Sequence, residues 1–211
     1  MAKKKKILLF GGTFNPIHNG HLTIAQDAVE LLSFDEVIFI PSATPPHKKT
    51  SLSFSHRLKM VDLAIEGVKY FRYSDIEAKR EGPSYTIDTV RHFKKEMKDS
   101  EIYWLIGMDV IKEFKTWHKF KELLAECKFV IAGRNFDKND NPYPPLIKSL
   151  GGKNVMFFFN KASYVSLSNI IVDISSTDIR NRIQQNTGSI MFLVPEKVEK
   201  YIYDNKLYQN K

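Results

Sequence analysis

The chain has 211 residues, of which 43% are hydrophobic and 27% charged, with a formal net charge of +8 and one cysteine. This size and composition predict one globular domain over residues 1–211. No apolar run approaches the roughly 18 residues of a transmembrane helix, and the apolar stretch behind Lys3–Lys6 is too short for a signal peptide. Because Cys127 is the only cysteine, an intramolecular disulfide and a cysteine zinc site are excluded, which favours a cytoplasmic setting.

The positive charge raises the question of nucleic-acid binding. Lys3–Lys6 carry four of the excess charges, since 8 minus 4 leaves only +4 for the rest of the chain. A basic end of this kind is usually a solvated segment that keeps a protein soluble. The charge is therefore a weak argument for a nucleic-acid partner, and we expect none.

Short β-branched and aromatic runs alternate with amphipathic segments of helical length, which is typical of a parallel sheet with crossover helices. The first half is predicted to contain strand Ile7–Phe10, helix His21–Leu32, strand Glu36–Ile40, loop Ser42–Ser53, a helix over about Ser55–Glu66, a strand near Tyr70–Ile76 and a helix near Thr86–Met97. The second half is predicted to contain strand Ile102–Ile106, helix Met108–Glu126, strand Phe129–Ala132, loop Asn135–Asn154, and strands Val155–Phe159 and Ile170–Ile174. Two helices are predicted to end it, one that follows Ser176 and runs to about Gln185 and one from Pro195 to about Tyr203.

The segment Gly11–His21, with the sequence GGTFNPIHNGH, is the most informative of the chain. It follows the first predicted strand and opens the first helix, which is where an open parallel sheet places its ligand. Glycines let the backbone approach a phosphate, and a helix N-terminus offers N–H groups and a positive dipole end. The segment matches neither the GxGxxG dinucleotide fingerprint nor the P-loop, so hydride transfer and P-loop kinase chemistry are disfavoured.

A second segment, Ile174–Arg180 with the sequence ISSTDIR, combines helix-capping residues with an arginine. Serine and threonine place hydroxyls and backbone N–H groups at a helix start. Arg180 lies in the same first turn and can add a bidentate cation for a phosphate. Taken alone, the same residues also fit a plain helix cap with a surface arginine.

The two segments together resemble the two signatures of the HxGH nucleotidyltransferase superfamily. Gly12–Pro16 followed by His18–His21 is similar to the first signature, and Ile174–Arg180 is similar to the second, ISSTxxR. The resemblance implies a Rossmann-like α/β fold, a doubly wound parallel sheet with flanking helices and a C-terminal helical segment. Further segments resemble bacterial nicotinate-mononucleotide adenylyltransferases, namely Pro45–Lys48, Glu81–Thr86 with Asp88 and Thr89, Gly107–Asp109, Trp117 and Arg134.

The resemblance covers about Ile7–Arg134 and Val172–Tyr208 but not Asn135–Ile171, which is similar to an insertion within the domain. Two residues depart from the family pattern. Asn15 stands where the family commonly has aspartate, and His118 stands where a tyrosine often follows the tryptophan.

The reaction implied by the resemblance is attack of the nicotinate mononucleotide phosphate on the α-phosphorus of ATP, giving the dinucleotide and pyrophosphate in NAD biosynthesis. The nucleophile is already an anion, so catalysis is expected to come from positioning and from neutralising phosphate charge. Mg²⁺ is expected on the triphosphate, held mostly by phosphate oxygens and water, without a metal site built by the protein. The expected partners are ATP and nicotinate mononucleotide, with no membrane partner, and the sequence does not indicate an oligomeric state.

The resemblance also implies which residues carry the reaction. His18, His21 and Arg180 are implied to be catalytic, with His21 donating at the α-phosphate. The residues implied for ATP are Gly12, Thr13, Phe14, Lys48, Gly107, Asp109, Ser176 and Thr177. The residues implied for nicotinate mononucleotide are Tyr85 and Thr86, through backbone N–H groups on the carboxylate, Trp117, which stacks on the ring, and Arg134, which takes the phosphate.

Competing interpretations remain. Phosphopantetheine adenylyltransferases share both signatures, but Pro45–Lys48 and Glu81–Thr86 disfavour them. A preference for nicotinamide mononucleotide is harder to exclude, because this substrate differs from nicotinate mononucleotide only at one carboxylate. From another class, an inactive nucleotide-binding regulator would keep the fold, although it has little reason to keep His18, His21 and Arg180 together.

Overall fold

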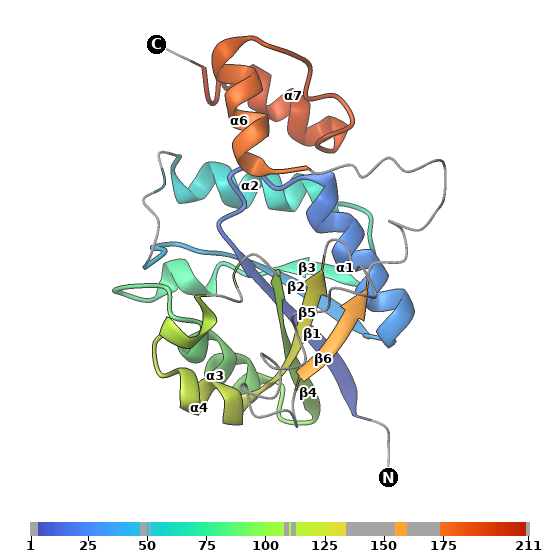
Figure 1. The fold of residues 1–211 in the computed structure, drawn as a ribbon, viewed down its shortest axis with the longest axis vertical. Helices are drawn as coiled ribbons and strands as arrows, with labels where there is room; N and C mark the ends of the chain where they lie inside the picture. Colours follow the sequence, from blue (N-terminus) through green and yellow to red (C-terminus); the bar gives the residue numbers. More distant parts are fainter. Residues whose placement is uncertain are drawn as a thin grey trace, which may run out of the picture.

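The computed structural model describes residues 4–46, 50, 52–107, 110, 113–133, 155–159 and 174–209. Its centre is a sheet of six parallel strands in the order β3-β2-β1-β4-β5-β6 (Figure 1). The strands are β1 Lys5–Gly12, β2 Glu36–Pro41, β3 Phe71–Tyr73, β4 Ser100–Gly107, β5 Lys128–Gly133 and β6 Val155–Phe159. This is the strand order of a doubly wound Rossmann-like sheet, as predicted.

The helices cover both faces of the sheet. They are α1 Asn19–Leu32, α2 Phe54–Ile65, α3 Thr86–Glu96, α4 Phe120–Glu126, α6 Ser176–Gln185 and α7 Glu196–Asp204, with the 3₁₀ helices η1 Ile76–Lys79 and η3 Phe114–Thr116. Figure 1 shows α6 and α7, the predicted C-terminal helical segment, together at one end of the molecule beside α2.

Alternate residues of β1 enter two separate cores. Leu8 and Phe10 pack into a cluster with residues of α1, α2, α6 and α7, whereas Ile7 and Leu9 pack into a cluster with residues of α3 and α4. A strand that is buried on both faces needs a continuous apolar run, which is what the sequence of β1 has.

The strand order places the segment after β1 at the turning point of the sheet. From β1 the chain winds to β2 and β3 on one side, and it then crosses to β4, β5 and β6 on the other. In such sheets ligands bind outside the carboxyl ends of the strands where the winding direction changes. The loop from Gly12 to His18 leaves β1 at this point.

Three predicted elements differ from the structure. The helix Met108–Glu126 is wrong as one continuous element, because η3 and α4 are separated by Trp117–Lys119 and Lys119 has a left-handed φ of 51°. The strand predicted near Tyr70–Ile76 is shorter in the structure, where β3 covers only Phe71–Tyr73 and Ile76 begins η1. Of the strand Ile170–Ile174, only Ile174 is described, and it is not in a strand. The loop Asn135–Asn154 lies outside the described residues.

In the described part of the chain, no helix has the length and apolar character needed to cross a membrane.

Candidate functional site: the junction of two distant helix starts

The turn after β1 is tight because two glycines leave room for aromatic rings. A Cβ on Gly11 would lie 2.3 Å from Cζ2 of Trp104, and a Cβ on Gly12 would lie 3.0 Å from the Phe14 ring. Phe14 has a left-handed φ of 46° and is buried, so its ring folds back over Gly12. The predicted residues Gly12, Thr13 and Phe14 thus form one compact turn directly at the end of the central strand.

The two histidines of the first signature are stacked on each other at the start of α1. Their ring centroids are 3.7 Å apart, and the backbone N–H of His18 donates to Nδ1 of His21 at 3.2 Å. Since Nδ1 of His21 accepts, the proton of the neutral imidazole is on Nε2. His21 is therefore oriented as an N–H donor.

Gly20 explains the spacing of the two histidines. A Cβ at this position would lie 3.1 Å from Nδ1 and 3.2 Å from Cε1 of His18, closer than most side-chain contacts. The glycine lets the His18 ring lie against the first turn of α1, where it is 4% exposed. A larger residue at position 20 would push this ring away from His21.

The second signature packs against the first. Ser175 caps α6 by accepting from the Asp178 N–H at 3.0 Å, and Ser176 Oγ donates to the carbonyl of Pro16 at 2.8 Å. Arg180 Nη1 donates to the carbonyl of Asn15 at 2.8 Å, and Nη2 contacts Oγ1 of Thr177 at 3.2 Å. The segments that resemble the two signatures are therefore held together by direct hydrogen bonds, although they lie at opposite ends of the chain.

A second cation, Arg57 of α2, holds the same turn and was not predicted from the sequence. Its side chain is fully buried and donates through Nη1 to the Thr13 carbonyl at 2.8 Å. Burial lowers the pKa of Arg57, while Tyr208 and Glu77 act in the opposite direction. A signal for it exists, because Arg57 stands at helical spacing with the buried residues Met60, Val61 and Ile65.

Tyr208, near the C-terminus, is a further unpredicted contact of this turn. Its hydroxyl donates to Oδ1 of Asn15 at 2.7 Å. Burial raises the pKa of Tyr208, so the phenol stays protonated as a donor, although Arg180 and Arg57 oppose the shift. Asn15, one of the two departures from the family pattern, thus accepts one hydrogen bond on its side chain and one, from Arg180, on its backbone.

Two of the residues predicted for the pyridine nucleotide, Tyr85 and Thr86, lie at the start of α3. The loop before this helix has Gly82 at a left-handed φ of 86°, and Tyr85 is the N-cap residue. The Tyr85 N–H donates to the Pro83 carbonyl at 3.0 Å. His118 stacks on the Tyr85 ring at 4.1 Å, whereas Trp117 packs edge-on against Phe114 at 5.0 Å.

Of the four other predicted positions, the structure describes one. Gly107 ends β4, the strand next to β1. Lys48, Asp109 and Arg134 lie outside the described residues.

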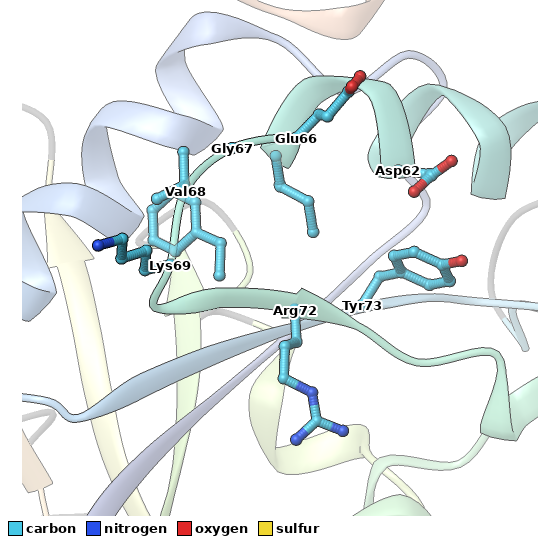
Figure 2. Close-up of a pocket in the computed structure, with 9 residues that line it drawn as sticks. Asp62, Glu66, Gly67, Val68, Lys69, Arg72 and Tyr73 are labelled. Atoms are coloured by element: carbon cyan, nitrogen blue, oxygen red, sulfur yellow. The ribbon is translucent and has the colours of Figure 1, made fainter.

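A separate hollow of about 470 Å³ lies between the end of α2 and β3, away from the two signatures (Figure 2). Three of its charged residues pair with residues outside it: Asp62 with Lys59, Glu66 with Lys197, and Arg72 with Glu36. Figure 2 shows Arg72 pointing away from Asp62 and Glu66. None of the predicted site residues lines this hollow.

Within the described ranges, no group of three or more His, Cys, Asp or Glu side chains is arranged to hold a metal ion. The junction of α1 and α6 offers instead hydroxyls, imidazoles and guanidinium groups beside two helix N-termini. Such a set suits phosphate groups.

Comparisons with known proteins agree with this chemistry. The sequence profile of the family described as cytidylyltransferase-like matches residues 9–182. A Clostridium novyi protein named "Probable nicotinate-nucleotide adenylyltransferase" is 40% identical over 97% of this chain and 100% of its own length. A protein of the same name from Pelobacter propionicus is 38% identical, over 96% of this chain and 98% of its own length.

A solved structure shows the same fold. The Plasmodium falciparum nicotinic acid mononucleotide adenylyltransferase, complexed with NaAD, superposes with a TM-score of 0.78, 20% identity and 97% coverage of both chains. This likeness confirms the predicted fold class, and the curated relatives confirm the resemblance drawn from the two signatures. The chain belongs to the cytidylyltransferase-like family and, within it, to the nicotinate-nucleotide adenylyltransferases.

Proposed function

We propose that this chain transfers the adenylyl group of ATP to nicotinate mononucleotide, which yields nicotinate adenine dinucleotide and pyrophosphate. The observation that carries the proposal is the junction of the two signatures, where Ser176 and Arg180 donate to the carbonyls of Pro16 and Asn15. This junction brings the N-termini of α1 and α6, together with Arg180, to the point where the strand order of the sheet reverses. The curated relatives of the chain are named for this reaction.

In the proposed step, a phosphate oxygen of nicotinate mononucleotide attacks the α-phosphorus of ATP. A new oxygen–phosphorus bond forms as the bond from the α-phosphorus to the bridging oxygen of pyrophosphate breaks. The nucleophile is an anion and gives up no proton, so the site needs no general base. Its task is to hold two polyanions in line and to stabilise the charge that develops on the α-phosphate and on pyrophosphate.

The two histidines and the α1 N-terminus are proposed to act at the α-phosphate. His21 is oriented by the His18 N–H so that its Nε2–H is the donor, and His18 is fixed against Gly20. Arg180 is proposed to act in two ways. Its hydrogen bond to Asn15 keeps the turn in place, and its charge lies at the α6 N-terminus, where the outer phosphates would sit.

The remaining assignments rest on the family resemblance. Gly12, Thr13 and Phe14 are proposed to line the transferred group, and Lys48, Ser176 and Thr177 to bind outer phosphates. Gly107 and Asp109 are proposed for adenosine, the Thr86 N–H beside Tyr85 for the nicotinate carboxylate, Trp117 for the ring, and Arg134 for the mononucleotide phosphate. Mg²⁺ is proposed to arrive with ATP as part of the substrate and to neutralise phosphate charge.

We also propose that residues 1–211 form one domain with a cytoplasmic location. One of the two core clusters contains residues of β1, α2 and α7, so both described ends of the chain pack into the same cluster. The only cysteine, Cys127, is buried, and burial raises the pKa of its thiol to about 12, which makes it an inert apolar side chain.

A pyrophosphate-release assay tests the proposed acceptor. ATP and Mg²⁺ are supplied with nicotinate mononucleotide, nicotinamide mononucleotide or phosphopantetheine in parallel reactions. We expect the highest kcat/KM with nicotinate mononucleotide. Faster release with either other acceptor would change the assigned substrate, and release with none of the three would favour a regulator that only binds nucleotides.

A further inference from the structure

A buried polar cluster lies at the base of the loop Gly82–Thr86. It consists of Glu77, Arg80 and Thr89, and we call it the Thr89 cluster. The Thr89 hydroxyl donates to Oε1 of Glu77 at 2.8 Å and accepts from Nη2 of Arg80 at 2.7 Å. Thr89 is 0% exposed and Glu77 is 4% exposed. The hydroxyl of one α3 residue thus bridges η1 and the arginine that precedes the loop.

The middle of the same loop is fixed by a second pair of hydrogen bonds. The Ser84 N–H donates to the Thr44 carbonyl at 2.9 Å, and the Thr44 N–H donates to Ser84 Oγ at 3.0 Å. Thr44 lies in the loop that follows β2, on the path toward Pro45–Lys48. The loop Gly82–Thr86 is therefore restrained at its base by the Thr89 cluster and at its centre by Thr44.

Because the Glu77 carboxyl of the Thr89 cluster is buried, it depends on its hydrogen-bond partners. Burial raises the pKa of Glu77, while the hydroxyls of Thr89 and Ser84 and the Arg80 guanidinium act against that rise. A buried carboxyl that loses such partners is costly, so the hydrogen bond from Thr89 to Oε1 of Glu77 holds the start of α3 against η1. None of the three cluster residues belongs to the loop Gly82–Thr86. The cluster therefore acts on the loop only indirectly, by fixing the backbone on either side of it.

The backbone at the end of this loop presents unused donors. In the described part of the chain, the N–H groups of Thr86 and Ile87 in the first turn of α3 have no protein acceptor, whereas the Tyr85 N–H is taken by Pro83. A carboxylate accepts hydrogen bonds on both oxygens, whereas a carboxamide offers one acceptor and one NH₂ group that would face the donors. Selection of a carboxylate therefore depends on the direction in which these N–H groups point.

We infer that Thr89 is a positioning residue for recognition of the nicotinate carboxylate, acting through Glu77 and Arg80 on the loop Gly82–Thr86. The inference rests on the proposed function and assigns specificity to residues that do not line the substrate. It also predicts different effects on the two substrates. The ATP side of the site is held by other contacts, those of Pro16 and Asn15 with α6, so ATP binding should not depend on Thr89.

Thr89→Val tests the inference, because it keeps the shape of the side chain and removes the hydroxyl. We expect KM for nicotinate mononucleotide to rise about 5- to 30-fold and KM for ATP to stay within about twofold. The selectivity for nicotinate over nicotinamide mononucleotide should fall by a similar factor. Thr89→Ser, which restores the hydroxyl, should recover both values, and Thr187→Val, at an exposed loop position, is the matched control.

Unchanged KM for nicotinate mononucleotide in folded Thr89→Val, or an equal rise in both KM values, would overturn the positioning role. If Thr89→Val does not fold, Arg80→Met breaks the same hydrogen-bond chain at a residue that is not fully buried, and the same split between the two KM values is expected. Failure of the wild-type protein to turn over nicotinate mononucleotide would instead overturn the proposed function, so the two failures are distinguishable.

Discussion

Replacement of Arg180 by alanine should weaken the junction of the two signatures. The side chain donates to the Asn15 carbonyl at 2.8 Å and contacts Thr177 Oγ1 at 3.2 Å, and it is only partly exposed. Hydrogen bonds to charged groups contribute about 1.5–3 kcal/mol, and partial exposure favours the lower end, about 1.5 kcal/mol. For a chain of this size that free energy corresponds to a fall in Tm of about 3–6 °C.

Arg182→Ala is the matched control on the same helix. Its guanidinium pairs with Asp178 at 2.9 Å and donates to the Ser189 carbonyl in an exposed, long hydrogen bond of 3.3 Å, and the side chains of Arg182 and Asp178 are both more than a third exposed. An exposed pair of this spacing contributes about 0.3–0.5 kcal/mol, so the Tm should fall by no more than about 2 °C. The two variants remove the same chemical group, and only Arg180 touches the turn after β1.

The assay combines thermal unfolding with steady-state kinetics for both substrates. Arg180→Ala should raise KM for ATP and lower kcat, with a smaller effect on KM for nicotinate mononucleotide, because the Asn15 turn and the α6 N-terminus serve the ATP side. Equal Tm shifts for the two variants, or an unchanged KM for ATP in Arg180→Ala, would refute the reasoning.

Three further predictions concern single residues. His21→Ala should lower kcat by roughly 10²–10³, because one oriented donor is lost, and a kcat within threefold of wild type would contradict this role. Gly20→Ala should lower kcat/KM by about tenfold, since the new Cβ, 3.1 Å from His18, displaces that ring; an unchanged value would show that the stack is dispensable. Cys127, with a thiol pKa of about 12, should resist a thiol reagent at pH 8 in the folded protein and react after unfolding, so rapid labelling of native protein would be inconsistent with its burial.

Local sequence chemistry predicted the elements that build the site. Helix α6 ends at Gln185 as expected and begins at Ser176, one residue earlier than expected, because Ser175 rather than Ser176 is the cap. The buried central strand β1 was recognisable from its apolar run. The predicted helix Met108–Glu126 failed because the left-handed Lys119 carries no glycine or proline signal.

The contacts that hold the site were not accessible from the sequence in the same way. Arg57, Ser176 and Arg180 donate to backbone carbonyls, and a carbonyl acceptor has no residue type that a pattern could reveal. The Thr89 cluster was missed for a related reason, because a threonine in an amphipathic helix resembles a solvated residue until its tertiary partners are known. Arg57 alone offered a signal, as a charge within the apolar stripe of its helix.

Transfer of label from ATP labelled in its α-phosphate tests the central claim most directly. With wild-type protein, Mg²⁺ and nicotinate mononucleotide, the label should appear in nicotinate adenine dinucleotide, in amounts equal to the pyrophosphate released. Label that remains in ATP, or that appears only in ADP or AMP without dinucleotide, would contradict adenylyl transfer at the junction of α1 and α6.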